Sequence, residues 1–213
     1  GGTGTGKSQV CREIGYNLIK QKVKIGYIAL EESVKRSVQG FVSIGLNKQI
    51  HIPEVKKEIP KEELIKEWEG LKDYVAYYDH FGSHTTEDLI NKIRYMVTAL
   101  DCKIIFLDHI SIVISGLENN DERRLIDNTM TSLRQLVEEL KCGMFVVSHL
   151  KRPDNKTSHE EGLQVSLSHL RGSHSLATLS NQVISFERNQ QSELENNILT
   201  CRVLKNRFSG DTG

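Results

Sequence analysis

The chain opens with glycine-rich residues that match the pattern G-x-x-x-x-G-K-[ST], which is typical of loops that bind nucleotide phosphates. In such a loop the backbone amides turn toward phosphate oxygens, the lysine reaches the β- and γ-phosphates, and the hydroxyl is a magnesium ligand. The pattern therefore predicts a nucleoside triphosphate with Mg²⁺. The residues predicted to bind the nucleotide are Gly1, Gly2, Thr3, Gly4, Thr5, Gly6, Lys7 and Ser8.

Two acidic positions follow apolar runs and complete the chemistry that such a loop needs. Asp108 follows residues 104–107 and is predicted to hold magnesium together with Ser8. Glu31 follows residues 25–30 and is predicted to orient or deprotonate the attacking water, because the carboxyl ends of parallel strands open onto the ligand crevice. Glu32 remains the alternative, since alternation along a strand does not say which of the two side chains faces the nucleotide.

Two polar residues farther along the chain also follow expected strands. His149 comes after the apolar run 144–148, where it is predicted to sense the γ-phosphate. Arg207 follows the last expected strand, where it could reach the γ-phosphate of a neighbouring subunit. The residues alone leave open that Arg207 is an ordinary surface arginine.

A cluster of cations follows His149 in a polar, proline-containing stretch, residues 151–161, that predicts an exposed loop. Three cations on one loop are suited to gripping the phosphates of a nucleic acid, although such a run is also common in solvated loops. The cations are Lys151, Arg152 and Lys156.

Short β-branched runs alternate with amphipathic segments, and this alternation predicts an α/β fold with a mostly parallel sheet flanked by helices. We expect a helix over 121–140 with Asp121 as its N-cap, and a charged surface helix over 56–69. The expected strands are 24–30, 74–78, 103–107, 144–148, 182–187 and 198–204.

Length, charge, cysteine spacing and hydropathy limit the classes of protein to which this chain can belong. The 213 residues are enough for one α/β domain, and 28 basic against 28 acidic residues give no global positive field, so any nucleic-acid contact must come from a local cluster or from repeated copies. The four cysteines are far apart, which argues against a zinc ribbon or a disulfide framework and predicts reduced core thiols. No run is long and apolar enough to span a membrane, so we expect a cytoplasmic protein. We also expect residues 1–213 to be a fragment that lacks the strand before the phosphate loop and its C-terminal end.

Further sequence blocks accompany the phosphate loop: residues 30–33 (LEES), 107–113 (LDHISIV), 121–123 (DER), 149–151 (HLK), 159–162 (HEEG), 170–173 (LRGS), 187–191 (ERNQQ) and 207–213 (RFSGDTG). Together they resemble the helicase domain of the bifunctional primase-helicases of short-tailed phages, relatives of the mitochondrial helicase Twinkle and of bacterial DnaB-type replicative helicases. The resemblance implies a RecA-like P-loop NTPase core in which Glu31 is the catalytic carboxylate, Asp108 the Walker B acid, His149 the γ-phosphate sensor and Arg207 a finger that acts across subunits.

The resemblance also implies what the protein works with. It implies hydrolysis of ATP or another (d)NTP with Mg²⁺, 5′ to 3′ movement on single-stranded DNA, a hexameric ring, and a primase domain and a DNA polymerase as companions in a bacterial or phage-infected cytoplasm. DNA contacts would come from Lys151, Arg152, Lys156, Arg171, Gly172 and Ser173. The alternatives are a RecA-type recombinase that forms filaments, and a nucleotide-switched assembly or loading module.

Overall fold

The computed structural model describes residues 6–78, 85–110, 119–151, 163–170, 174–194 and 196–213. The chain forms two compact units. The first, here called the sheet unit, comprises Ser8–Val113 and Leu136–Val147. The second, here called the hairpin unit, comprises Gly1–Lys7, Ile114–Gln135 and Ser148–Gly213. Helix α6 (Asn119–Leu140) contributes residues to both.

The sheet unit is built on four parallel strands in the order β2-β1-β3-β4. Their bounds are β1 (Ile25–Ala29), β2 (Val75–Tyr77), β3 (Ile104–Asp108) and β4 (Gly143–Val146). In the register of the two central strands, Ile25 pairs with Ile104 and Ala29 with Asp108. All of β1 is buried, as expected for a strand covered on both faces. The predicted α/β class with a parallel sheet is confirmed.

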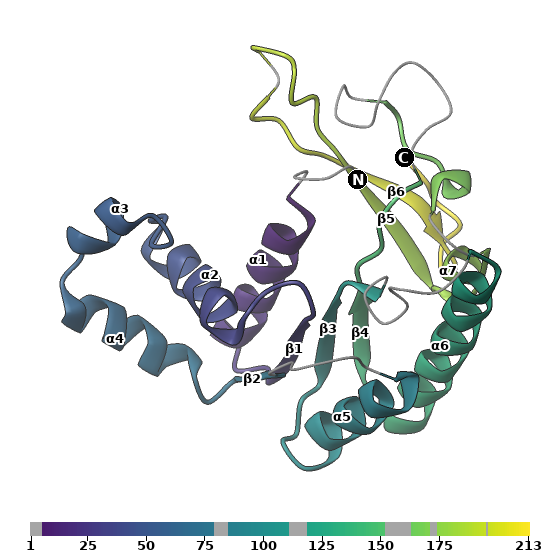
Figure 1. Ribbon diagram of the computed structural model, residues 1–213, viewed down its shortest axis with the longest axis horizontal. Coiled ribbons are helices and arrows are strands. Elements are labelled where there is room, and N and C mark those ends of the chain that lie inside the picture. Colours follow the sequence, from purple (N-terminus) through teal and green to yellow (C-terminus); the bar gives the residue numbers. More distant parts are fainter. Residues whose placement is uncertain (1–5, 79–84, 111–118, 152–162, 171–173, 195) are drawn as a thin grey trace. The chain divides into compact units, whose positions relative to one another are not determined.

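Besides the end of α6, the sheet unit contains five helices of the described chain (Figure 1): α1 (Lys7–Lys20), α2 (Val34–Leu46), α3 (Pro53–Lys57), α4 (Lys61–Leu71) and α5 (Thr86–Thr98). On one face Tyr27 packs against Phe41 of α2, with ring centroids 5.1 Å apart, and against Phe106 of β3. On the other face α5 approaches so closely that a Cβ on Gly26 would lie 2.8 Å from the sulfur of Met96. The sheet is therefore the middle layer of an α/β/α sandwich.

The expected surface helix over 56–69 is instead two helices, α3 and α4, and the prediction of one helix was wrong. Pro60 is the N-cap of α4. A proline disfavours the helical conformation in the residue before it, so the chain leaves the helical conformation between α3 and α4. The long helix also differs from its prediction. It begins at Asn119, so Asp121 lies within its first turn rather than at its N-cap.

The hairpin unit contains an antiparallel pair, β5 (Gln182–Glu187) and β6 (Thr200–Asn206), with the short helix α7 (His174–Leu179) before it. The sequence predicted a strand at 182–187 and another at 198–204 without giving the direction in which they pair, and the structure pairs them antiparallel. A parallel connection needs a crossover, usually a helix. In the described part of residues 188–199 the chain forms turns and no helix, so the second strand returns alongside the first.

Two observations concern composition. Among the cysteines, Cys11, Cys102 and Cys142 are buried free thiols, as predicted, but Cys201 is exposed on β6, so the prediction that all four lie in the core was wrong. No helix in the described part of the chain has the length and apolar character needed to cross a bilayer.

Candidate functional site

Asp108 is the last residue of β3 and is only 7% exposed. Its carboxylate accepts a hydrogen bond from the side chain of Ser8, the second residue of α1. Burial raises the pKa of Asp108 above its ordinary value, while the bond from Ser8 and the nearby charges of His109 and Arg12 offset part of that rise. The structure thus brings together the two residues that the sequence predicted as magnesium ligands.

The two neighbouring acids after β1 have different surroundings. The carboxylate of Glu32 is held by Arg12, whose Nη2 lies 2.7 Å from each of its oxygens, and the Glu32 side chain is 13% exposed. The side chain of Glu31 is 57% exposed, and its Oε1 lies 2.5 Å from Nε2 of the buried His109. Glu32 is therefore engaged in the interior, whereas Glu31 has its carboxylate at the carboxyl end of the sheet and open to solvent.

The backbone connects these acids. The amide of Leu30 donates to the carbonyl of Asp108 at 2.7 Å, which extends the β1–β3 ladder by one residue beyond the last strand pair. Glu31 therefore lies directly after the point where the two central strands, β1 and β3, end. This is the edge at which ligands bind in open parallel sheets.

Only the end of the phosphate-loop motif lies among the described residues. Gly6 has a φ of +90°, a conformation that favours glycine, and α1 begins directly after it at Lys7. Predictions on Gly1, Gly2, Thr3, Gly4 and Thr5 fall outside the described residues.

In the hairpin unit, His149 is half-buried and Lys151 is exposed. The backbone N of Lys151 donates to the carbonyl of His169 at 2.8 Å, and Leu150 forms an antiparallel bridge with Leu170. These contacts bring the segment after His149 beside residues 167–170. The other predicted DNA contacts, Arg152, Lys156, Arg171, Gly172 and Ser173, lie outside the described residues.

A cavity of about 420 Å³ lies within the hairpin unit. It combines three basic side chains with two hydroxyls, two leucines and one acid, a composition suited to a phosphate and an apolar group. Sequence reasoning gave Arg123 and His174 no role, although Arg123 belongs to one of the sequence blocks that carried the resemblance. The lining residues are Arg123, Asp127, Lys151, Leu167, Ser168, Leu170, His174 and Ser175.

Arg207 is exposed immediately after β6. Its Nη2 donates to the carbonyl of Thr178 at 2.6 Å. Lys205 donates from Nζ to the carbonyls of Ala177, Thr178 and Ser180 at 2.6, 3.1 and 2.9 Å. Both cations thus satisfy carbonyls at the end of α7, and desolvation together with the charge of Arg207 lowers the pKa of Lys205. Sequence reasoning gave Lys205 no role.

Comparison with known families decides the classification. The family model described as DnaB-like helicase C terminal domain matches residues 1–213. This chain belongs to the DnaB-like helicase C-terminal domain family. The chain is also similar to the DNA helicase/primase of Enterobacteria phage T3, with 41% identity over 219 residues. That alignment covers 100% of this chain and 38% of the T3 protein, so the chain spans well under half of its relative.

Solved structures agree on the fold of this DnaB-like domain. The ATPase domain of G40P superposes with a TM-score of 0.81 at 17% identity, covering 100% of this chain and 76% of that one. A DnaB-like replicative helicase studied with primase gives a TM-score of 0.80 at 18% identity, covering 100% and 52%. A KaiC-like protein from Pyrococcus horikoshii superposes with a TM-score of 0.65 at 16% identity, covering 100% of this chain and 80% of that one. The fold is that of a RecA-like ATPase core.

Proposed function

We propose that this chain is the motor domain of a replicative DNA helicase, which hydrolyses ATP or another (d)NTP to move 5′ to 3′ along single-stranded DNA and to unwind duplex DNA. The observation that carries the proposal is the buried Asp108 carboxylate, which accepts a hydrogen bond from Ser8 directly behind the phosphate-loop motif. The relative from phage T3, described as a DNA helicase/primase, supports the same activity.

The residues around Asp108 fit a magnesium ion. Mg²⁺ prefers oxygen ligands and keeps several waters, so it is usually held by one or two protein groups together with substrate phosphates. The Ser8 hydroxyl and the Asp108 carboxylate supply such oxygens, and burial makes the charged form of Asp108 costly unless a cation neutralises it. When bound, Mg²⁺ would neutralise charge that develops on the phosphates. Lys7 would hold the β- and γ-phosphates.

Glu31 is the carboxylate best suited to orient and deprotonate the attacking water. Its side chain is exposed at the carboxyl end of the sheet, whereas Glu32 is held by Arg12. A general base must reach the proton it abstracts, and the exposed position of Glu31 at the carboxyl end of the sheet supports that role. His149 would sense the γ-phosphate from the segment after β4.

Arg207 would complete the site of a neighbouring subunit in a ring. Its exposed position after β6 supports a role as a finger that stabilises charge on the transferred phosphoryl group. To do so, the guanidinium would exchange the Thr178 carbonyl for the neighbour's nucleotide. A hexamer of this chain would place six such sites between subunits, and the whole protein would work with primase and a DNA polymerase.

The DNA would be held by the hairpin unit. Lys151 lines the cavity of about 420 Å³ together with Arg123, and cations of this kind bind the phosphates of a single strand. The remaining proposed contacts are Arg152, Lys156, Arg171, Gly172 and Ser173. A near-neutral chain can bind DNA in this way when several copies line one channel, because each copy supplies only a small cluster.

The test is hydrolysis and unwinding by the intact protein. We expect Mg²⁺-dependent nucleotide hydrolysis that single-stranded DNA stimulates, its loss in Lys7→Ala, and strand separation on a forked duplex. A RecA-type recombinase would form filaments and exchange strands without separating a fork. A nucleotide-switched loading module would bind nucleotide with little turnover. Unimpaired turnover by Lys7→Ala would overturn the assignment of the phosphate loop.

A further inference from the structure

A partly buried ion pair joins α1 to the loop between β1 and α2. Nη2 of Arg12 donates to both carboxylate oxygens of Glu32 at 2.7 Å. Both side chains are 13% exposed, so the pair is shielded from water. Because Arg12 lies in the helix that starts at Lys7, the pair ties the helix behind the phosphate-loop motif to the loop that carries Glu31.

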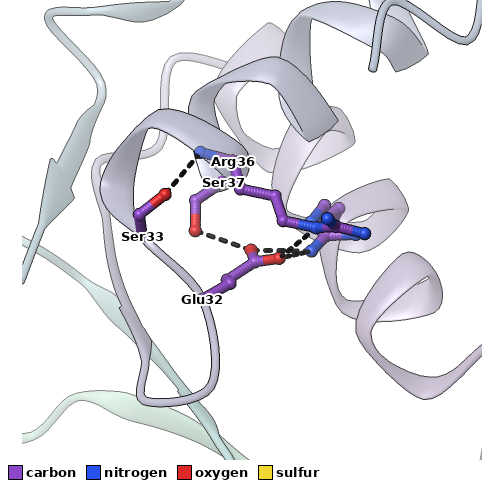
Figure 2. A network of polar contacts seen from close by, with 5 residues as sticks. Glu32, Ser33, Arg36 and Ser37 are labelled. Carbon is purple, nitrogen blue, oxygen red and sulfur yellow. Dashed lines mark hydrogen bonds and ion pairs between the residues drawn. The ribbon is translucent and has the colours of Figure 1, made fainter. Parts of the chain in front are cut away.

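The rest of the network fixes Glu32 from the other side (Figure 2). The hydroxyl of Ser37 donates to Oε1 of Glu32 at 2.7 Å, and Ser37 is itself buried in the first turns of α2. The side chain of Ser33 caps the same helix by accepting from the backbone N of Arg36. Glu32 therefore has one orientation, which anchors the start of α2 to the end of β1.

The side chain of Glu31, the neighbour of Glu32, has different surroundings. The two acids are adjacent in the bend that follows β1, and while the Glu32 side chain is held in the interior at 13% exposed, that of Glu31 faces the solvent at 57% exposed. Oε1 of Glu31 lies 2.5 Å from Nε2 of His109. His109 directly follows Asp108 in the sequence, so Glu31 is held beside the carboxyl end of β3.

We propose that Arg12 and Glu32 are positioning residues that hold Glu31 in place for the attack of water on the nucleotide. The inference rests on the proposed function, because it gives Glu31 the role of general base. Neither Arg12 nor Glu32 touches the nucleotide in this scheme. They act by restricting the loop that carries Glu31 and by linking that loop to α1. The position of Glu31 relative to α1, the helix that follows the phosphate-loop motif, is thereby fixed.

The stem of Arg12 offers an independent way to disturb the pair. A Cβ on Gly40 of α2 would lie 2.6 Å from Cδ and 2.7 Å from Nε of Arg12. Gly40→Ala should therefore displace the Arg12 side chain without changing either acid, and alanine is the more favourable residue within a helix. A loss of turnover in this variant would come from Arg12 rather than from α2.

The experiment compares the intact wild-type protein with Glu32→Gln, Glu31→Gln and the double variant, using ATP, Mg²⁺ and single-stranded DNA. We expect Glu32→Gln to lower kcat by about 10²-fold, the loss expected for a displaced catalytic group, with KM changed by about twofold or less. The double variant should be no slower than Glu31→Gln, because Glu32 acts only through Glu31. A residue that only stabilises the fold would lower activity further in the double variant.

Arg36→Ala is the matched control. Nε of Arg36 lies 3.7 Å from the same carboxylate, but its side chain is 70% exposed, so we expect wild-type kcat and KM. Gly40→Ala should reproduce the selective loss of kcat, and it also serves as the test if Glu32→Gln does not fold. An unchanged kcat in both Glu32→Gln and Gly40→Ala, or additive losses in the double variant, would overturn the positioning role. If the wild type hydrolyses no nucleotide, or if Glu31→Gln is as fast as wild type, the proposed function itself fails.

Discussion

The side chain of Ser8, at the start of α1, donates a hydrogen bond to the carboxylate of Asp108, the last residue of β3. The two residues are far apart in the sequence, and the parallel pairing of β1 with β3 brings the end of β3 to the edge where α1 begins. Because Asp108 is 7% exposed, its charge is costly in the absence of a cation. This relationship links the phosphate-loop motif to the sheet and has a consequence for stability.

Asp108→Asn should raise the melting temperature while it abolishes hydrolysis. The raised pKa of Asp108 means that the folded state binds its proton more tightly than the unfolded state, so wild-type stability falls as pH rises through that pKa. Asparagine has no charge to desolvate. We expect an increase of about 2–4 °C at pH 7 in EDTA, which corresponds to about 1 kcal/mol in a domain of this size. The gain should fade as pH falls toward the ordinary carboxyl range.

Asp101→Asn is the control for that measurement. Asp101 is exposed, and its ion pair with Lys103 lowers its pKa. The pKa shift of Asp101 is therefore opposite in direction to that of Asp108. Substitutions of exposed side chains change stability little, so we expect a melting temperature close to that of wild type. A melting temperature in Asp108→Asn that equals or falls below that of wild type at pH 7 would contradict the expected cost of the buried charge.

The four thiols should react very unequally with a maleimide. Burial raises the pKa of Cys11 to about 12 and that of Cys102 to about 11, so neither forms much thiolate near neutral pH. Cys142 is also buried, whereas Cys201 is exposed on β6. We expect mass spectrometry of the native protein at pH 7.5 to show a single label, at Cys201. Cys201→Ser should remain unlabelled until denaturant is added.

Sequence patterns were sufficient for the central strands and for Asp108, because a buried parallel strand is a continuous apolar run and its end is marked by the first polar residue. They were not sufficient to separate Glu31 from Glu32. The orientation of Glu32 is decided by Arg12, 20 positions earlier, and by Ser37, and no local pattern records that contact. Nor did alternation reveal the β5–β6 hairpin, since a strand looks the same whichever way its partner runs.

The cations after His149 should set the salt dependence of DNA binding. Replacing Lys151, Arg152 and Lys156 together with alanine should reduce the slope of log affinity against log salt by about 2, since each phosphate neutralised on a single strand contributes about 0.7. Fluorescence anisotropy with labelled oligothymidine measures that slope. Alanine at Lys56, Lys57 and Lys61, which are exposed in or beside α3 and α4, removes the same charge and should leave the slope unchanged. Equal effects of the two sets would mean that only net charge matters.

Arg207→Ala should lower DNA-stimulated hydrolysis by about 10³-fold or more, as expected for the loss of a finger that stabilises the transferred phosphoryl group. The fold should tolerate the change. Lys205 alone still donates to three carbonyls at the end of α7, so the Thr178 carbonyl keeps a donor when Arg207 is removed. Circular dichroism and melting temperature close to those of wild type would establish that the loss is chemical. Arg207→Lys should remain impaired, because a lysine does not reproduce the planar guanidinium.

Mixing two inactive variants tests whether Arg207 acts across a subunit boundary. Lys7→Ala removes the phosphate-loop lysine from its own subunit, and Arg207→Ala removes the proposed finger from the next. In a randomly mixed ring with head-to-tail interfaces, about a quarter of the interfaces would combine an intact Lys7 with an intact Arg207. Hydrolysis should therefore return when the two proteins are mixed before ring assembly. If Arg207 serves the nucleotide of its own subunit, every site in the mixture lacks one of the two residues, and the mixture stays as inactive as its components.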